Sequence, residues 1–198
     1  MNRLEESLRG IFGDLSDMER SGALVGGLAV SVRTEPRFTR DVDVAVVVRD
    51  DSDAELLIHA LLQHGYRSFG LVEQEATSRL AAIRLERPDA TGALAGDVVD
   101  LLFASSGIEP EIVSAADVME VFPELRLPVA STGHLLALKV LSRDDEKRPL
   151  DRADILALLE TATEDDLATA RTALALIEKR GYARGKSLLR EFESLVTR

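Results

Sequence analysis

The sequence predicts an α/β (α+β) protein that begins with mixed strands and helices and ends in a helical C-terminal lobe. Through the first two thirds of the chain, short apolar runs rich in β-branched residues alternate with stretches of helical period. From Ser131 onward, the apolar stripes have the helical period. We therefore expect a core over residues 1–128 and a helical C-terminal domain over residues 129–198.

The composition excludes several kinds of protein and of site. The chain has 198 residues, of which 45% are hydrophobic and 30% charged, and it has no cysteine. Disulfides, thiolate nucleophiles and cysteine-based metal sites are therefore excluded. No apolar run approaches the ~20 residues needed to span a membrane, so we expect a cytoplasmic protein without membrane contacts. The net charge of −11 repels nucleic acid unless a basic patch reverses the field locally.

The first part of the chain carries clear signals for individual elements. Leu4, Leu8 and Leu15 repeat at helical spacing, and the β-branched run at residues 41–48 is typical of a strand covered on both faces. Ser52 is placed as the N-cap of a further helix. The predicted helices span residues 2–15 and 52–65, and the predicted strands span residues 21–27, 41–48, 79–87, 97–105 and 125–131.

The last part of the chain has the signals of consecutive helices. They are predicted at residues 131–142, 150–160, 164–181 and 187–196. Thr163 and Asp166 form a capping pair, and Gly181 is placed to end a helix. Surface positions are expected for the histidines, which lie in helical stretches with polar neighbours: His59, His64 and His134.

Two carboxylates interrupt the apolar run at residues 41–48. Asp41 and Asp43 are two residues apart, so both side chains point to the same face of the predicted strand. Ionised carboxylates in a low-dielectric region repel each other and lose hydration, so a cation must compensate them. One alternative is that the strand end opens into water or that nearby arginines compensate the charge, namely Arg33, Arg37 and Arg40. The other is a divalent metal ion, whose usual ligands are carboxylates completed by substrate phosphates.

A metal site of this kind usually needs a third carboxylate from a neighbouring strand. Asp100 lies inside the predicted strand at residues 97–105, whereas Asp97 stands at its start, where a strand-end role is commoner, so we prefer Asp100. Gly26 and Gly27 precede the acidic strand by a short spacer. Because glycine lets a backbone approach a ligand closely, we expect this pair to face phosphate in the same cleft.

These residues together resemble the signature of the nucleotidyltransferase superfamily related to DNA polymerase beta. Gly26-Gly27, a spacer of thirteen residues and Asp41-Val42-Asp43-Val44 match its glycine turn and Asp-x-Asp strand. The residues from Leu125 to Leu159 are similar to the AbiEii-type toxin branch of that superfamily. The resemblance implies a nucleotidyltransferase-like mixed sheet flanked by helices, followed by a helical C-terminal lobe.

The resemblance also implies roles for individual residues. Asp41, Asp43 and Asp100 would hold magnesium, two ions in all, with Asp100 at the ion that activates the acceptor hydroxyl. Lys139 would neutralise the triphosphate, and Asp151 would accompany it, with Asp154 as the second choice. The nucleotide-binding residues would be Gly26, Gly27, Arg40 and Lys139.

The reaction that the resemblance implies is transfer of a nucleoside monophosphate from an NTP to an acceptor hydroxyl. For a toxin of this branch the acceptor would be tRNA, and a cognate antitoxin would be the partner. The alternatives are a small cationic acceptor such as an aminoglycoside, and an inactive module that binds a nucleotide or a partner. Gly27 keeps the last alternative open, since many members have serine there. The basic segment at residues 179–190 contacts either an RNA backbone or only solvent at a helix end.

Overall fold

The computed structural model describes residues 3–35, 39, 41–74, 77–88, 94–144, 146 and 149–197. Its elements run, in chain order, α1(Arg3–Asp17), β1(Gly22–Val25), α2(Gly26–Arg33), β2(Val42–Val46), α3(Asp51–Gln63), β3(Arg67–Gln74), β4(Arg79–Pro88), β5(Leu94–Leu102), α4(Glu109–Ser114), β6(Asp117–Phe122), β7(Leu125–Val129), α5(Thr132–Ser142), α6(Pro149–Thr161), α7(Glu164–Lys179) and α8(Leu188–Val196). The predicted α/β class is confirmed.

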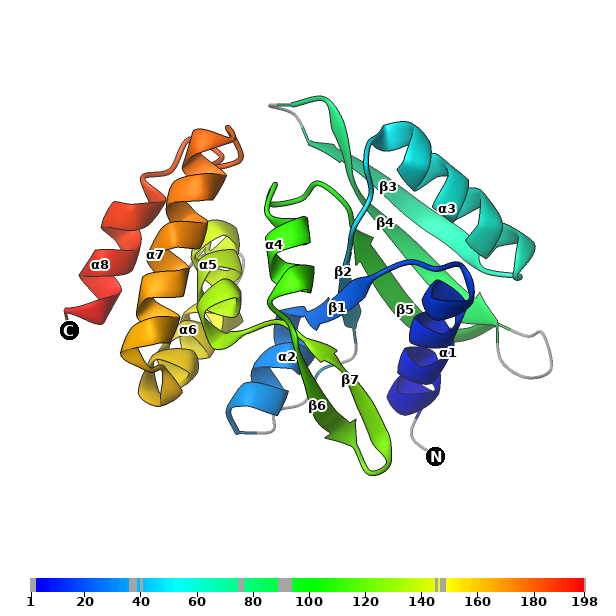
Figure 1. The fold of residues 1–198 in the computed structure, drawn as a ribbon, viewed down its shortest axis with the longest axis horizontal. Helices are drawn as coiled ribbons and strands as arrows, with labels where there is room; N and C mark the ends of the chain where they lie inside the picture. The colour runs from blue at the N-terminus through cyan, green and yellow to red at the C-terminus, as the bar shows by residue number, and fades with distance from the viewer. Residues whose placement is uncertain are drawn as a thin grey trace.

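The strands, all of which lie in the first part of the chain, form one mixed sheet (Figure 1). Over the described residues it has seven strands in the order β3-β4-β5-β2-β1-β7-β6. β2 pairs in parallel with β5, β1 pairs in parallel with β7, and the remaining neighbours are antiparallel. The acidic strand β2 therefore lies in the middle of the sheet, next to β5, although 47 residues lie between the two strands along the chain.

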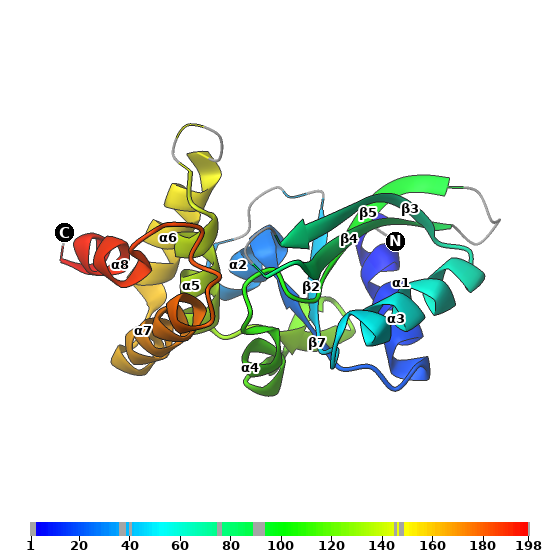
Figure 2. The same cartoon turned by 90° about the horizontal axis from the view of Figure 1, so that it is seen from above.

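One face of the sheet forms the hydrophobic core. Val44, Leu101 and Ile83 are paired across β2, β5 and β4, and all three are buried. α1 contacts β2, β4 and β5, and α3 contacts β4, so these two helices cover that face (Figure 2). No helix among the described residues lies over the opposite face of β3, β4 and β5.

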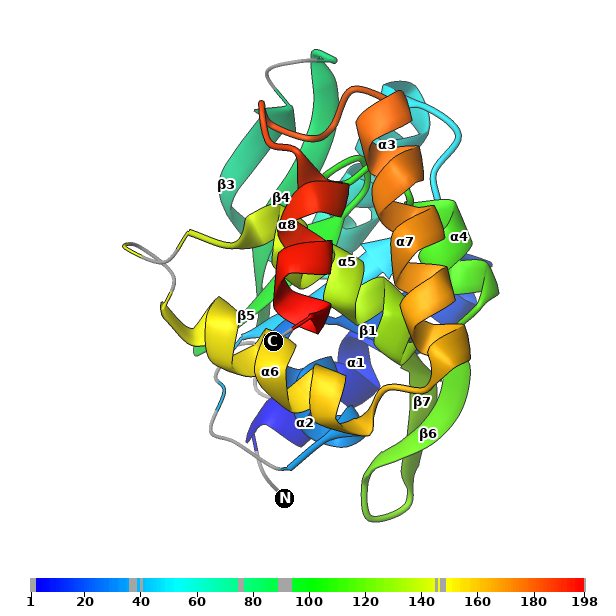
Figure 3. The same ribbon diagram turned by 90° about the vertical axis from the view of Figure 1, so that its left-hand side faces the viewer.

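The C-terminal helices stand together at the other end of the molecule. α5 packs against α6, α7 and α8, and α2 connects this group to the sheet through its contacts with α5 and α6 (Figure 3). Beyond Val129 the described chain is helical, as the sequence predicts, but the boundary between two domains at residue 128 stays a prediction.

Most predicted elements appear with small shifts of their ends, but four were not predicted: α2, β3, α4 and β6. The predicted N-cap at Ser52 is wrong, because the Asp50 side chain accepts the hydrogen bond from the Asp53 N–H and α3 begins at Asp51. The Thr163–Asp166 capping box is confirmed. None of the described helices is both long and apolar enough to cross a membrane.

Candidate active site

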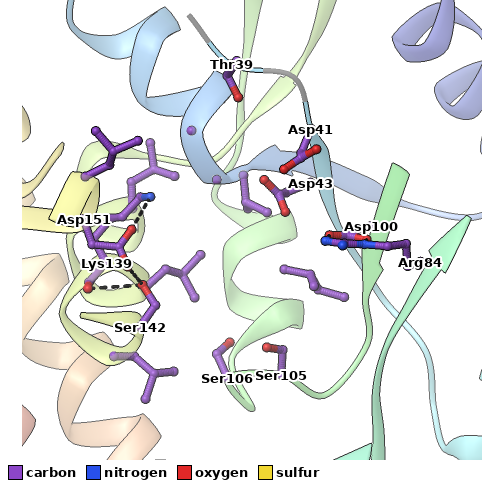
Figure 4. A pocket seen from close by; sticks show the side chains of 18 of the residues that line it. Thr39, Asp41, Asp43, Arg84, Asp100, Ser105, Ser106, Lys139, Ser142 and Asp151 are labelled. Carbon is purple, nitrogen blue, oxygen red and sulfur yellow. Dashed lines mark hydrogen bonds and ion pairs between the residues drawn. The ribbon is translucent and has the colours of Figure 1, made fainter. Parts of the chain in front are cut away.

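Strand register places three charged residues in a row across the face of the sheet that α1 and α3 leave uncovered. Asp43 of β2 is the partner of Asp100 in β5, and Asp100 is the partner of Arg84 in β4. Partners in adjacent strands point to the same face, so the three side chains are neighbours. Asp41 lies directly before β2 and is exposed, and its side chain lies beside that of Asp43 (Figure 4).

The Gly-Gly pair forms the start of α2 directly beside this row. Gly26 has a φ of 69°, a left-handed conformation that favours glycine. A Cβ atom at Gly26 would overlap with the Asp43 carboxylate, so a side chain there is also excluded by space. The N-cap residue Val25 makes no side-chain hydrogen bond to the first turn of α2. The first backbone N–H groups of a helix have no partner within the helix, and here they lie at the end of α2 that is beside Asp43.

A cavity of about 690 Å³ opens between this part of the sheet and the C-terminal helices. Figure 4 shows Asp41, Asp43, Asp100 and Arg84 on one side of it and Lys139, Ser142 and Asp151 on the other. Its polar lining residues are Thr39, Asp41, Asp43, Arg84, Asp100, Ser105, Ser106, Lys139, Ser142, Asp151 and Arg184, with Gly26 and Gly27 at the start of α2. The structure thus brings the predicted residues Gly26, Gly27, Asp41, Asp43, Asp100, Lys139 and Asp151 to one cavity.

Arg84, which the sequence did not indicate, is the cation that compensates Asp100. Its Nε donates to Oδ1 of Asp100 at 2.9 Å and its Nη2 donates to Oδ2 at 2.7 Å. The hydrogen-bonded Asp100 carboxylate raises the pKa of the Arg84 guanidinium, and Asp41 and Asp43 act in the same direction. Charge compensation by an arginine is therefore real, but the arginine comes from a different strand.

The arginines near the acidic strand in sequence do not provide this compensation where they are described. Arg33 donates to the Asp117 carboxylate at 2.7 Å and to the carbonyl oxygens of Val129 and Ala130, so its assignment to the aspartates is wrong. Arg37 and the predicted nucleotide-binding residue Arg40 lie outside the described residues. For Asp97, the alternative to Asp100, only the backbone within β5 is described.

The carboxylates suit a hard divalent cation by their chemistry but are not arranged around one position. Oxygen ligands on Asp41, Asp43 and Asp100 are the kind that magnesium prefers. Among the described side chains, however, no three acidic or histidine groups are placed so that they could hold one ion together. The Asp100 carboxylate lies against Arg84 instead, apart from Asp41 and Asp43 (Figure 4).

On the opposite wall, Lys139 of α5 joins both aspartates that were candidates for its companion. Its Nζ lies 2.9 Å from Oδ1 of Asp151 and 2.7 Å from Oδ2 of Asp154. The three side chains are at most 9% exposed, and Ser142 donates to Oδ2 of Asp151 at 2.9 Å. Asp151 is among the residues that line the cavity, whereas Asp154 is not.

A loop after β5 and a C-terminal segment close the end of the cavity. Ser105 and Ser106 line it, and the buried carboxylate of Glu109 accepts bonds from the Ser106 N–H and Oγ, while burial raises the pKa of Glu109. Arg184 lines the cavity too and donates to the Ser105 carbonyl oxygen at 3.2 Å. Ser105 and Ser106 were not predicted as site residues, because serine in a loop carries no sequence signal of its own.

The basic segment at residues 179–190 makes protein contacts that neither expectation included. Arg180 donates to both Glu111 carboxylate oxygens and to the Gly107 carbonyl oxygen. Lys186 donates to the carbonyl oxygens of Leu141 and Arg143. These two cations therefore fasten the segment to the rest of the protein.

Among the solved structures that are similar to the chain, the first of the following three supports the class of fold. An antigenic nucleotidyltransferase-like protein from Paracoccidioides brasiliensis is 16% identical, with a TM-score of 0.58, over 98% of this chain and 92% of that one. ANT(2")-Ia in complex with adenylyl-2"-tobramycin is 14% identical, with a TM-score of 0.49, over 98% of both chains. The toxin MenT4 from Mycobacterium tuberculosis H37Rv is 15% identical, with a TM-score of 0.35, over 89% and 84%. No curated protein sequence matches the chain.

The fold, with Asp43 on a central strand, Asp41 directly before that strand and a glycine-started helix beside them, is that of a nucleotidyltransferase-like protein. The family described as the nucleotidyl transferase AbiEii toxin of type IV toxin–antitoxin systems matches residues 11–196. The chain therefore belongs to the AbiEii nucleotidyltransferase family, and the resemblance noted in its sequence is confirmed.

Proposed function

We propose that the protein is a magnesium-dependent toxin that transfers a nucleoside monophosphate from an NTP to a hydroxyl group of tRNA. The acceptor oxygen forms a bond to the α-phosphorus, the bond to the leaving phosphate breaks, and pyrophosphate is released. The observation that carries the proposal is the juxtaposition of Asp43, Asp100 and the start of α2 in one cavity. Membership of the AbiEii family supports the toxin role, and a cognate antitoxin is then the expected partner.

The first turn of α2 binds phosphate in this proposal. Its N–H groups begin at Gly26 and Gly27, and the N-cap residue Val25 makes no side-chain hydrogen bond to them. Helix N-termini of this kind attract anions through both hydrogen bonds and the helix dipole. Since Gly27 supplies backbone only, the N–H groups perform the task without a hydroxyl.

Asp41, Asp43 and Asp100 are the proposed magnesium ligands. Two bound ions would stabilise the attacking and leaving oxygens of the in-line displacement. Asp100 is also proposed to accept the proton of the acceptor hydroxyl, and its position across from Asp43 at the border of the cavity supports this role. The exposed position of Asp41 leaves room for water and phosphate oxygens around any ion that it holds.

Lys139 is proposed to interact with the triphosphate from the opposite wall. Its ammonium group already lies between Asp151 and Asp154, so a phosphate oxygen competes with Asp151 for it. Asp151 is the aspartate of the two that borders the cavity, which supports its assignment as the companion of Lys139.

A second candidate function keeps the chemistry and changes the acceptor. The net charge of −11 favours a small cationic molecule, such as an aminoglycoside, over a polyanion. The two functions differ in which acceptor becomes labelled and in whether expression inhibits growth or confers drug resistance.

The test is incubation of the protein with magnesium and each α-labelled NTP in turn, with total tRNA or an aminoglycoside as the acceptor. We expect label in tRNA with the wild type and none with Asp41→Asn or Asp43→Asn. Asp17→Asn, at the exposed end of α1, is the matched control and should transfer normally. Label in the aminoglycoside alone would establish the second candidate. If no acceptor is labelled with any NTP, both functions are wrong and a binding module without turnover is the remaining class.

A further inference from the structure

The ion pair between Arg84 and Asp100 occupies the carboxylate that the proposed metal site needs. Both oxygens of Asp100 accept a hydrogen bond from the guanidinium, at 2.9 and 2.7 Å. Such a two-point pair is among the strongest charge-assisted contacts that a carboxylate makes. A divalent cation that takes Asp100 as a ligand therefore meets an established cation at the same two atoms.

The two partners differ in how easily they can separate. The Arg84 side chain is 53% exposed, whereas that of Asp100 is 16% exposed. The guanidinium can turn into water without losing much burial, but Asp100 has little access to water and needs a cation wherever Arg84 goes. Arg84 is thus the mobile partner, and Asp100 stays beside Asp43 because the β2–β5 register fixes it there.

Electrostatics sets the direction of the effect on metal binding. Asp41 and Asp43 also act on the Arg84 guanidinium, so its charge lies within the field of all three carboxylates. A positive charge held there opposes the arrival of a divalent cation and keeps Asp100 from turning toward Asp43.

We propose that Arg84 is a built-in counter-ion that competes with the divalent cation for Asp100, so that metal binding and release of Arg84 are coupled. The inference rests on the proposed function, since it takes Asp41, Asp43 and Asp100 to be the metal ligands. In the metal-free protein Arg84 keeps the carboxylates from repelling one another. It thereby weakens metal binding, so that the site is occupied only when the concentration of the divalent cation is high enough to displace Arg84 from Asp100.

The test measures binding of Mn²⁺ alone, by electron paramagnetic resonance of the free ion, with no nucleotide present. Arg84→Met should bind Mn²⁺ about tenfold more tightly than the wild type, a change that corresponds to about 1.4 kcal/mol. Arg84→Lys keeps a competing charge and should stay close to the wild type. The matched control is Arg79→Met, which removes the same charge from the same strand but breaks a pair with Asp51, a residue outside the cavity.

A second measurement uses the wild-type protein and does not depend on how well the variants fold. The Nε–H signal of Arg84 in a nitrogen-15 spectrum is identified by its absence from Arg84→Lys. Addition of Mg²⁺ should shift this signal and speed its exchange with water, while the Arg79 signal stays unchanged. A signal that does not respond at saturating Mg²⁺ would overturn the inference.

The outcomes separate this inference from the proposed function. Asp43→Asn should abolish Mn²⁺ binding if the ion occupies the proposed site. Binding that Asp43→Asn removes but Arg84→Met leaves unchanged or weakens would overturn the competition and leave the metal site intact. If neither the wild type nor Arg84→Met binds Mn²⁺, the metal site and the inference both fail. Tighter binding in Arg84→Met supports the inference even if no acceptor is ever labelled.

Discussion

Gly26 meets two constraints that a residue with a side chain cannot meet together. Its backbone is left-handed, with a φ of 69°, and a Cβ atom would enter the space of the Asp43 carboxylate. The first constraint lets the chain turn from β1 directly into α2, and the second lets the start of the helix lie against the acidic strand. The position of a proposed metal ligand therefore depends on the absence of one methyl group.

Gly26→Ala should displace the Asp43 carboxylate and strain the backbone. We expect nucleotide transfer to fall more than about 100-fold, as when reacting groups are misplaced by about 1 Å. The free energy of unfolding should fall by about 1–3 kcal/mol, because a non-glycine residue is held in an unfavourable conformation. Transfer assays and urea unfolding measure the two effects.

The control for this substitution is Gly13→Ala on an exposed part of α1, where a Cβ atom would meet nothing within 4 Å. Alanine favours the helix there by about 1 kcal/mol, so stability should rise and transfer should stay unchanged. Normal transfer by Gly26→Ala would show that the close approach to Asp43 is not needed.

At the scale of an element, α5 begins with a polar contact that the sequence did not indicate. His134 was expected at the surface, and this expectation is wrong: it is 6% exposed, with Nδ1 2.8 Å from the Oγ of the N-cap residue Ser131. Burial lowers the pKa of His134, and Glu111 opposes this shift only in part. The folded protein therefore holds a neutral imidazole at the start of a helix, where the dipole also disfavours a positive charge.

Acidification should destabilise the protein through His134. As the pH falls below the ordinary histidine value of 6.5, the unfolded state binds a proton that the folded state binds only at lower pH, so stability is lost over that interval. His134→Gln should lose less stability than the wild type between about pH 7.5 and pH 5, which is roughly the range in which histidine titrates. Urea unfolding at each pH measures the difference. His59→Gln, at an exposed site on α3, should behave like the wild type, and an unchanged pH dependence in His134→Gln would refute the assignment.

At the scale of the whole molecule, the net charge is strongly negative and the cavity lies between the sheet and the C-terminal helices. The C-terminal helices and the β3–β5 part of the sheet lie on opposite sides of the cavity. Between α7 and α8, Arg180 bonds to α4 and to the loop before it, and Lys186 bonds to the end of α5. Because these cations bond to the protein, they are poorly placed to form a patch for RNA. At a net charge of −11, a tRNA acceptor must approach against long-range repulsion.

Salt should therefore accelerate transfer to tRNA. Raising the ionic strength from about 10 mM to about 150 mM shortens the screening length from roughly 30 to 8 Å, and kcat/KM for tRNA at saturating NTP should increase. A basic binding patch would give the opposite result, a steep fall with salt, because bound counterions are released. A small cationic acceptor should also lose kcat/KM with salt, so a rise with salt is expected only for tRNA that approaches without a basic patch.

Local sequence patterns predicted the elements that have a buried side and the residues close together in the chain. The β-branched run after Asp41 gave the central strand, and the spacing from Gly26 to Asp43 indicated the catalytic class because both lie within one β1–α2–β2 unit. β3 was not predicted because it is an edge strand whose first seven residues are exposed, so it has no alternation of buried and exposed positions. β6, at the other edge, likewise has no buried residue.

By itself, the sequence determined the fold class, the acidic strand and the family. It did so because helical period, β-branched runs and short spacings are properties of consecutive residues. Only the tertiary structure decided that Asp100 lies beside Asp43, that Arg84 holds Asp100, and that Lys139 lies between Asp151 and Asp154. These partners depend on strand register and helix packing between distant segments, and one-residue shifts in register would send each side chain to the opposite face.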